Sequence, residues 1–391
     1  MTLQTPIDSS SPPRSARPKW LVILLLLVGA GALIFYFAIL PRLDTTPGFG
    51  PINAKPANSG AHTVFTGSGA SFPYPYYAKL FAEYSKLRPA VQIKYTSVGS
   101  SMGIKQISEQ ATDFGASDAP MSDAELKAAK GGAVLHIPLT LGAVVPIYNV
   151  PGVDKAKPLI FSGPVLADIF CGVVTKWNDP ALTALNPGIE LPATEISIVH
   201  RTDGSGTTYI FSEYLSKVSE DFAKTPGKGT VVDWPAVNKQ GANGSDGVAG
   251  VVSKTPGTIG YIELTYALQN KIAFGGVVNA AGKAIHANLR SVTAAAASRT
   301  KPPADLRMSI TNASGDSAYP ISAFSYLLVY KDQSDRAKAD ALADFLVWAV
   351  TDGQSLAPQL QYAPLPTDIA AIDQRVILSL TVNGKPFASE K

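Results

Sequence analysis

The chain has 391 residues, of which 46% are hydrophobic and 16% are charged, and its formal net charge is +3. This length suffices for two domains with a buried core, whereas the charged fraction is well below the roughly 25% typical of soluble chains. After residue 20 the sequence holds 30 basic and 29 acidic residues. That balance excludes nucleic acid as an expected partner, because such a ligand requires a basic surface. The single cysteine, Cys171, excludes an internal disulfide framework and a thiolate-rich metal site.

An uncharged run at 20–40, WLVILLLLVGAGALIFYFAIL, predicts one N-terminal transmembrane helix. At about 1.5 Å per residue the run spans about 30 Å, which is the thickness of the hydrocarbon core of a bilayer. The alternative is a cleaved signal peptide. That alternative requires about 7–15 apolar residues and a small-residue cleavage site, and the run is longer and ends without such a site.

The residues that flank this run predict its orientation. Arg14, Arg17 and Lys19 lie just before it. The positive-inside rule therefore predicts a cytoplasmic N-terminus at 1–19, an inner-membrane anchor, and a body on the periplasmic or extracellular side. Residues 41–61 contain four prolines and three glycines, a composition typical of a flexible linker.

After the linker, strand-like and helix-like segments alternate. The predicted strands, in chain order, are 62–67, 91–98, 135–150, 258–264 and 321–331. The predicted helices are 73–87, 101–110, 205–222 and 336–352, and all but 101–110 show apolar residues at helical spacing on one face. Pro73 suits the first helical position, where its missing N–H has no partner to lose. This alternation predicts an α/β fold with mostly parallel sheets.

Three segments share one design, in which a strand leads through a turn rich in Gly, Ser and Thr into a helix. They are TGSGASFPYPYYAKLF (66–81), TSVGSSMGIKQI (96–107) and HRTDGSGTTYIFSEYL (200–215). Each places free backbone N–H groups at a helix N-terminus, where the macrodipole adds partial positive charge, so each is a candidate anion site. Taken singly, Ser71, Ser100 and Ser205 are more often ordinary N-cap residues than ligand contacts.

Two charged side chains near these turns, Arg201 and Asp118, are further candidates for contact with an anion. Arg201 offers a planar guanidinium that suits a tetrahedral oxyanion, and its alternative role is an ion pair with Asp203. The two roles are compatible if Asp203 orients the guanidinium from behind. Asp118 lies in a turn of small residues, where a ligand role and an Asx turn are equally supported. Asp123 is expected to begin a helix.

Enzyme templates fit the chain poorly. DGSGT has Asp203 where a nucleophile elbow requires glycine, and GSSMGIK lacks the spacing and ending of a P-loop. GSGASF has Phe72 in place of the third glycine of a dinucleotide fingerprint. The four histidines are scattered, so no metal and no cofactor is predicted. A phosphatase that uses Ser205 or Ser71 as nucleophile remains an alternative without an evident base.

A longer set of runs carries a family resemblance. In chain order they are GSGASFPYPYYAK, VGSSMGIKQI, DFGASDAPMSD, KWNDPAL with LNPGIELP, RTDGSGTTYIF and TPGTIGYIE. Through them, residues 62–365 resemble the substrate-binding protein of the phosphate-specific ABC transporter. The resemblance implies a two-lobed periplasmic-binding-protein fold (type II) with a hinge. One lobe would be 62–149 plus 317–391, and the other 150–316.

The resemblance also implies phosphate binding without catalysis, with the permease and ATPase subunits of an ABC importer as partners. Family contacts to phosphate carry over, position by position, to Ser71, Phe72 (through its backbone N–H), Ser100, Asp118, Arg201, Ser205, Gly206 and Thr207. Asp203 matches the acid that pairs with the arginine. The spanning helix departs from relatives, which are usually secreted free or lipid-anchored. A membrane-tethered phosphate sensor is therefore a further alternative.

Overall fold

The computed structural model describes residues 63–299 and 301–386. The predicted cytoplasmic N-terminus (1–19), transmembrane helix (20–40) and linker (41–61) lie outside these ranges. Within the described ranges, no helix is both long and apolar enough to span a bilayer. All described residues belong to one compact unit, Ala54–Lys391.

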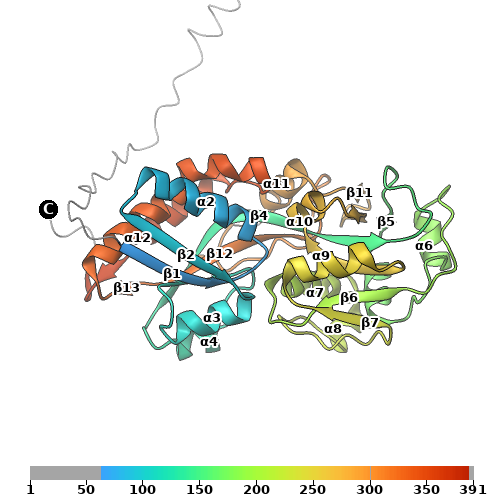
Figure 1. Ribbon diagram of the computed structural model, residues 1–391, viewed down its shortest axis with the longest axis horizontal. Coiled ribbons are helices and arrows are strands. Elements are labelled where there is room, and N and C mark those ends of the chain that lie inside the picture. The colour runs from blue at the N-terminus through green and yellow to red at the C-terminus, as the bar shows by residue number, and fades with distance from the viewer. Residues whose placement is uncertain (1–62, 300, 387–391) are drawn as a thin grey trace, which may run out of the picture. The chain divides into compact units, whose positions relative to one another are not determined.

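A nine-stranded sheet is the framework of this unit, with the strand order β2-β1-β3-β12-β4-β8-β6-β7 and with β9 also paired to β4 (Figure 1). Its strands are β1 (Thr63–Gly69), β2 (Val91–Ser97), β3 (Phe114–Ser117), β4 (Val134–Asn149), β6 (Ser197–Arg201), β7 (Lys239–Ala242), β8 (Thr258–Glu263), β9 (Ala273–Phe274) and β12 (Ser322–Tyr330). Two small sheets contain β5 (Ile160–Phe161), β10 (Gly276–Val278) and β11 (Ala284–Ile285), and β13 (Asp332–Gln333), β14 (Thr381–Val382) and β15 (Lys385–Pro386).

The large sheet is parallel toward both ends and antiparallel in its centre. β1 is parallel to β2 and β3, and β6 is parallel to β7 and β8. β12 is antiparallel to β3 and β4, and β4 is antiparallel to β8 and β9. The prediction of mostly parallel sheets is therefore wrong for the centre. Hydrophobic periodicity indicates a strand, but it carries no information about the direction of the neighbouring strand.

Strand β4 is shared by the two lobes of the fold. Val134–Ala143 pair with β12, whereas Val144–Asn149 pair with β8. The first lobe contains β1, β2, β3 and β12, the second contains β6, β7 and β8, and β4 runs from one to the other (Figure 1). Nearly all of β4 is buried, as its continuous apolar run predicts.

Helices cover both faces of the sheet. They are α2 (Tyr74–Leu87), α3 (Ser100–Ser108), α4 (Asp123–Ala128), α5 (Gly163–Cys171), α6 (Pro180–Leu185), α7 (Gly206–Val218), α8 (Glu220–Lys224), α9 (Gly244–Lys254), α10 (Leu264–Gln269), α11 (Leu289–Ala297), α12 (Arg336–Val350), α13 (Thr367–Leu378) and the 3-10 helix η1 (Asp352–Leu360). In the first lobe, α2 and α12 lie on one face, and α3 and α4 lie on the other (Figure 1).

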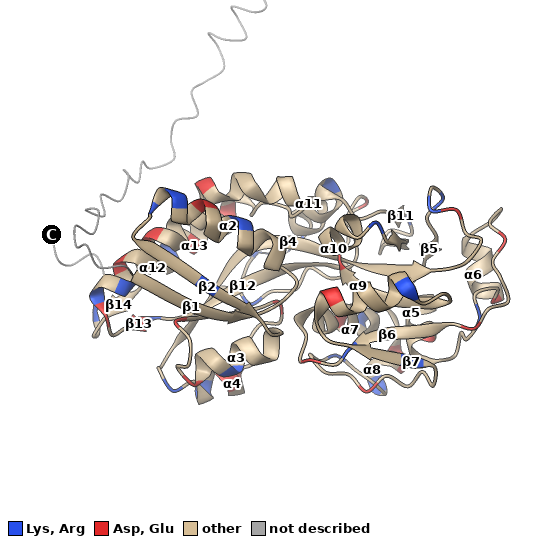
Figure 2. Cartoon of the chain, viewed as in Figure 1, with Lys and Arg blue, Asp and Glu red and all other residues tan. Residues whose placement is uncertain are grey.

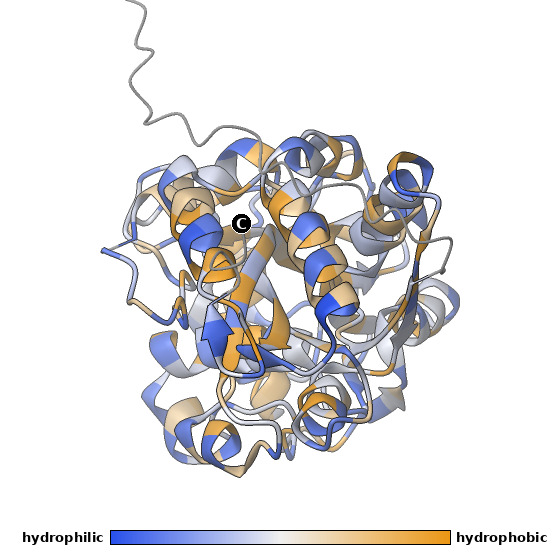
Figure 3. Ribbon diagram, turned by 90° about the vertical axis from the view of Figure 1, so that its left-hand side faces the viewer, coloured by the Kyte–Doolittle hydropathy of each residue, from blue (hydrophilic) through white to orange (hydrophobic). Residues whose placement is uncertain are grey.

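Aromatic rings form much of the core in each lobe. In the first lobe, the ring centroid of Phe345 lies 5.0 Å from that of Tyr84 and 5.7 Å from that of Phe81, which joins α12 to α2. In the second lobe, the rings of Phe211 and Tyr261 stack at 4.5 Å. Hydrophobic strands lie between helices of mixed hydropathy in Figure 3. Charged residues lie mainly on helices and loops (Figure 2), so the core depends on apolar burial.

The predicted elements match the observed ones except at a few ends. The helix predicted at 205–222 is divided into α7 and α8, because the Ser219 hydroxyl accepts a hydrogen bond from the Phe222 N–H at 3.2 Å and caps the second helix. Pro73 is the cap residue of α2 rather than its first helical residue. Asp123 begins α4 as predicted.

Candidate functional site

The first Gly/Ser-rich turn connects β1 to α2. Ser71 and Phe72 are both buried there. The Ser71 hydroxyl lies 3.0 Å from the hydroxyl of Ser245, so Ser71 is not a helix cap. Across residues 63–299 and 301–386, neither the Ser71 nor the Phe72 backbone N–H has a hydrogen-bond acceptor. The turn therefore offers two free amide donors.

The second turn connects β2 to α3, and Ser100 is the first residue of that helix. Its buried hydroxyl donates to Asp118 Oδ2 at 3.4 Å and accepts from the Asp118 N–H at 3.2 Å. Gly99 before it has φ +89°, and a Cβ there would lie 2.6 Å from Asp203 Oδ2. Only glycine allows this backbone conformation together with such a close approach.

The third turn connects β6 to α7. Ser205 is the N-cap of α7, since its hydroxyl accepts from the Thr208 N–H at 3.1 Å. The capping role expected for a single serine is thus observed here, and the hydroxyl hydrogen remains available for donation. The N–H groups of Gly206 and Thr207 have no acceptor among the described residues. The Thr207 hydroxyl is buried and also lacks a partner there.

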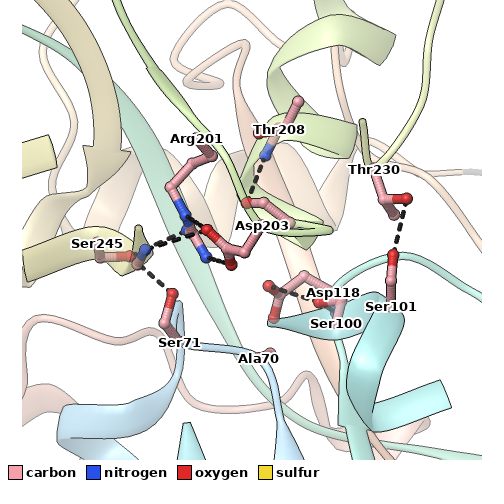
Figure 4. A network of polar contacts seen from close by, with 12 residues as sticks. Ala70, Ser71, Ser100, Ser101, Asp118, Arg201, Asp203, Thr208, Thr230 and Ser245 are labelled. Atoms are coloured by element: carbon pink, nitrogen blue, oxygen red, sulfur yellow. Dashed lines mark hydrogen bonds and ion pairs between the residues drawn. The ribbon is translucent and has the colours of Figure 1, made fainter. Parts of the chain in front are cut away.

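Arg201 ends β6, and its guanidinium is almost completely buried. Nε donates to Asp203 Oδ1 at 2.7 Å, Nη2 pairs with Asp203 Oδ2, and Nη1 donates to the Ser245 hydroxyl at 3.4 Å (Figure 4). Burial of Asp203 opposes its ionisation, but the hydrogen bonds and charge of Arg201 hold the pKa of that carboxyl below its usual value. Asp203 therefore binds the Nε and Nη2 edge of the guanidinium, and Nη1 points toward Ser245.

Asp118 follows β3 and is also buried. The hydroxyl of Ser325, on β12, donates to its Oδ1 at 2.7 Å. Burial raises the pKa of Asp118 to about 7, although Ser325, Ser100 and the charge of Arg201 all favour the carboxylate. Its two oxygens thus have defined hydroxyl partners, which distinguishes it from an Asx turn.

Hydrogen bonds between the lobes bring the turns together. The Ser101 N–H donates to Gly204 O at 3.0 Å, and the Ser101 hydroxyl donates to that of Thr230 at 2.9 Å. A Cβ on Gly206 would lie 2.5 Å from Asp118 Oδ2. Arg201, Asp203, Ser71, Ser100 and Asp118 accordingly surround one region in Figure 4. All nine residues singled out in the sequence lie on these turns or beside them.

Two residues of this region, Ser245 and Ser325, were not predicted from the sequence. Ser245 is the second residue of α9 and links Ser71 to Arg201. It belongs to a fourth Gly/Ser-rich helix start, NGSDG, whose preceding strand KQGA lacks an apolar alternation. Ser325 lies within an apolar strand, where no turn signal marks it. A search for every Gly/Ser-rich helix start would have found Ser245.

This arrangement is suited to a protonated oxyanion. Free amides, a buried guanidinium and hydroxyl groups are donors, and donors at helix N-termini stabilise negative charge. Among the residues that the structure describes, the hydrogen-bond partners of the Asp118 carboxyl oxygens are the Ser100 and Ser325 hydroxyls, and no basic side chain is bonded to it. A ligand with both anionic oxygens and one hydroxyl would match this set.

Comparison with known proteins identifies the family. The PBP superfamily domain matches residues 56–352. The phosphate-binding protein PstS of Xylella fastidiosa is 44% identical over 305 residues, covering 78% of this chain and 82% of its own. The chain belongs to the PstS phosphate-binding protein family. PstS of Methanocaldococcus jannaschii is 36% identical over 357 residues, covering 85% of this chain and 91% of its own.

A solved structure agrees with the PstS fold. A high-affinity periplasmic phosphate-binding protein, PfluDING, solved with bound phosphate, superposes with a TM-score of 0.65 at 20% identity, covering 79% of this chain and 92% of its own. At that identity the likeness concerns the fold alone. The described residues therefore have the mixed α/β, two-lobed fold of periplasmic binding proteins.

Proposed function

We propose that this chain binds inorganic phosphate outside the cytoplasm and delivers it to the permease and ATPase of an ABC importer. Membership of the PstS family supports the ligand and the partner. Phosphate would bind at the region surrounded by the three turns. The contacts would come from Ser71, Phe72 (N–H), Ser100, Asp118, Arg201, Ser205, Gly206 and Thr207, with Asp203 orienting the arginine.

The observation that carries this proposal is the set of buried donors without acceptors. The amides of Ser71, Phe72, Gly206 and Thr207 and the Thr207 hydroxyl have no partner within the described ranges. Buried donors without partners are costly and rare in folded proteins. Charge-assisted hydrogen bonds contribute about 1.5–3 kcal/mol each, and micromolar binding requires about 8 kcal/mol. Such a donor set therefore suffices for a tight anion complex even after ordering costs.

Asp118 would select the anion. An ionised carboxylate can only accept a hydrogen bond, so it requires a proton on the ligand. Hydrogen phosphate carries one at neutral pH, whereas sulfate does not. Sulfate would leave Asp118 repelled and unpaired, and sites that depend on such a hydrogen bond reject analogues by about 10⁴-fold.

The membrane anchor is part of the proposal, supported by the uncharged run at 20–40 and the basic residues before it. It would leave 1–19 in the cytoplasm and attach the binding unit through a linker at 41–61. Alkaline extraction of membranes from the native organism tests this: the chain should stay in the membrane pellet. Release into the supernatant as a shortened chain would contradict it.

Transfer to the importer would involve hinge motion between lobes divided at 62–149 plus 317–391 and 150–316, as in type II binding proteins. β4 passes from one lobe to the other where its pairing changes from β12 to β8, between Ala143 and Val144. We place the hinge near this change of partner, so the first boundary between the lobes would lie near 143 rather than at the predicted 149.

A phosphatase is less well supported. The Ser71 hydroxyl contacts the Ser245 hydroxyl, and the Ser205 hydroxyl contacts the Thr208 N–H. In the described part of the chain neither hydroxyl contacts an imidazole or a carboxylate that could act as its base. A chromogenic phosphate ester assay should show no turnover.

Calorimetric titration of the detergent-solubilised full chain tests the binding function. At about pH 9, well above the pKa of Asp118, phosphate should bind with a dissociation constant of about 1 μM or tighter, and sulfate should give no heat at millimolar concentration. Equal binding of the two anions would contradict the selectivity assigned to Asp118. No phosphate binding would contradict the function itself.

A further inference from the structure

The turn at residues 70–72 has an unusual set of hydrogen bonds on its carbonyl side. Three consecutive carbonyls each accept from a different tyrosine hydroxyl. The pairs are Tyr95 to Ala70 O at 2.7 Å, Tyr266 to Ser71 O at 2.6 Å, and Tyr362 to Phe72 O at 2.6 Å. The tyrosines come from β2, from α10 and from the segment after η1, so distant parts of the chain hold one short turn.

The geometry of the peptide bond connects these carbonyls to the proposed site. In a trans peptide, the C=O and N–H groups point in opposite directions from a rigid plane. The carbonyl of Ser71 and the N–H of Phe72 belong to the same peptide plane. The Ser71 carbonyl accepts from the Tyr74 N–H at 3.2 Å as well as from a tyrosine hydroxyl. A hydroxyl that helps to fix this carbonyl therefore also helps to fix the direction of the Phe72 N–H, which has no acceptor in the described ranges.

Tyr266 is the tyrosine best placed to act in this way. It is buried on α10, which directly follows β8 of the second lobe, whereas Ser71 follows β1 of the first. Burial raises the pKa of Tyr266 far above its ordinary value, so its hydroxyl keeps its proton and can donate. A hydrogen bond to a carbonyl also polarises the peptide group and strengthens the N–H at its other side as a donor.

We propose that Tyr266 is a positioning residue for anion binding, which aims and polarises the Phe72 amide by donating to the Ser71 carbonyl. This inference rests on the proposed function, since it concerns an amide assigned to phosphate. Tyr95 serves the Ser71 amide in the same way through the Ala70 carbonyl. The alternative is a purely structural role, in which these hydroxyls provide hydrogen bonds to buried carbonyls and contribute only to stability.

The test compares Tyr266→Phe with Tyr330→Phe in the full chain. Tyr330 is a matched control, because its hydroxyl donates to Ile107 O at 2.7 Å, at the opposite end of α3 from Ser100. Each change removes one hydroxyl and leaves the ring. Tyr266→Phe should weaken phosphate binding about ten-fold, and Tyr330→Phe should leave it unchanged. Melting temperatures without phosphate should fall by similar amounts in both variants.

A spectroscopic measurement separates positioning from stability. In protein labelled with ¹⁵N-phenylalanine and saturated with phosphate, the Phe72 amide proton should move upfield in Tyr266→Phe and stay in place in Tyr330→Phe. An unmoved Phe72 resonance, or unchanged affinity in Tyr266→Phe, would overturn the inference while wild-type phosphate binding left the proposed function intact. Failure of the wild-type chain to bind phosphate would instead remove the proposed function and this inference with it.

Discussion

Asp118 and Asp373 are both buried carboxyl groups, and burial raises the pKa of each, yet their surroundings differ. Asp118 accepts hydrogen bonds from Ser100 and Ser325 and lies in the field of Arg201. Asp373, on α13, has no hydrogen-bond partner for either oxygen among the described residues. α13 packs against α12 and β4, far along the chain from the Gly/Ser-rich turns.

The contrast shows that burial alone does not identify a functional carboxylate. A buried carboxyl without partners reduces stability, whereas one held by hydroxyl groups beside a guanidinium has a defined direction and a tuned affinity for protons.

Asp118→Asn should reduce the preference for phosphate over sulfate by about 10⁴-fold, because the amide can donate to an unprotonated anion. Competition calorimetry with both anions measures this ratio. Asp373→Asn is the matched control, since it makes the same change at a buried carboxyl outside the site, and its selectivity should equal that of the wild type. Selectivity that survives in Asp118→Asn would show that the comparison assigns the wrong carboxylate.

Arg201→Lys should weaken phosphate binding about 100-fold, because an ammonium group cannot pair with Asp203 and an anion through a planar fork. Calorimetry on the variant measures the loss. Arg88→Lys provides the control, since Arg88 pairs with Asp344 in an exposed ion pair away from the turns. An equal loss in both variants would point to a general effect of charge rather than to a contact.

Asp373→Leu should raise the free energy of unfolding at pH 7 by about 1–3 kcal/mol, because it removes a buried polar group without partners. The pKa of Asp373 is raised in the folded state by burial. The contribution of Asp373 to stability is therefore most favourable below its unfolded pKa of about 3.9. This contribution is lost as the pH rises toward the folded pKa. Urea unfolding should show a gain in the variant that shrinks between pH 7 and pH 4. A gain that is constant with pH would contradict the raised pKa.

Local sequence patterns predicted five strands of the large sheet and four of the longer helices, because apolar periodicity reports which side of an element is buried. The strands predicted from the apolar runs at 135–150 and 321–331 match β4 and β12 closely. Their antiparallel pairing was not predictable in this way, since β12 returns from the C-terminal part of the chain to lie between β3 and β4. Such long-range order depends on tertiary packing.

The residues of the candidate site were predictable where a Gly/Ser-rich turn before a helix marks them in the sequence. Ser71, Ser100 and Arg201 each lie in or beside a Gly/Ser-rich helix start, and the resemblance joined them. Ser325 and Tyr266 were not predictable, because each lies in a buried element whose residues look like ordinary core. Their roles follow from hydrogen bonds that join residues about 200 positions apart.

Diffraction from crystals of the chain grown with phosphate tests the central claim most directly. The phosphate should lie between Arg201 and the Ser71–Phe72 turn, with one of its oxygens about 2.5–2.7 Å from Asp118, the distance of an O–H···O⁻ hydrogen bond. Phosphate bound elsewhere, or bound here with Asp118 turned away from it, would contradict the account.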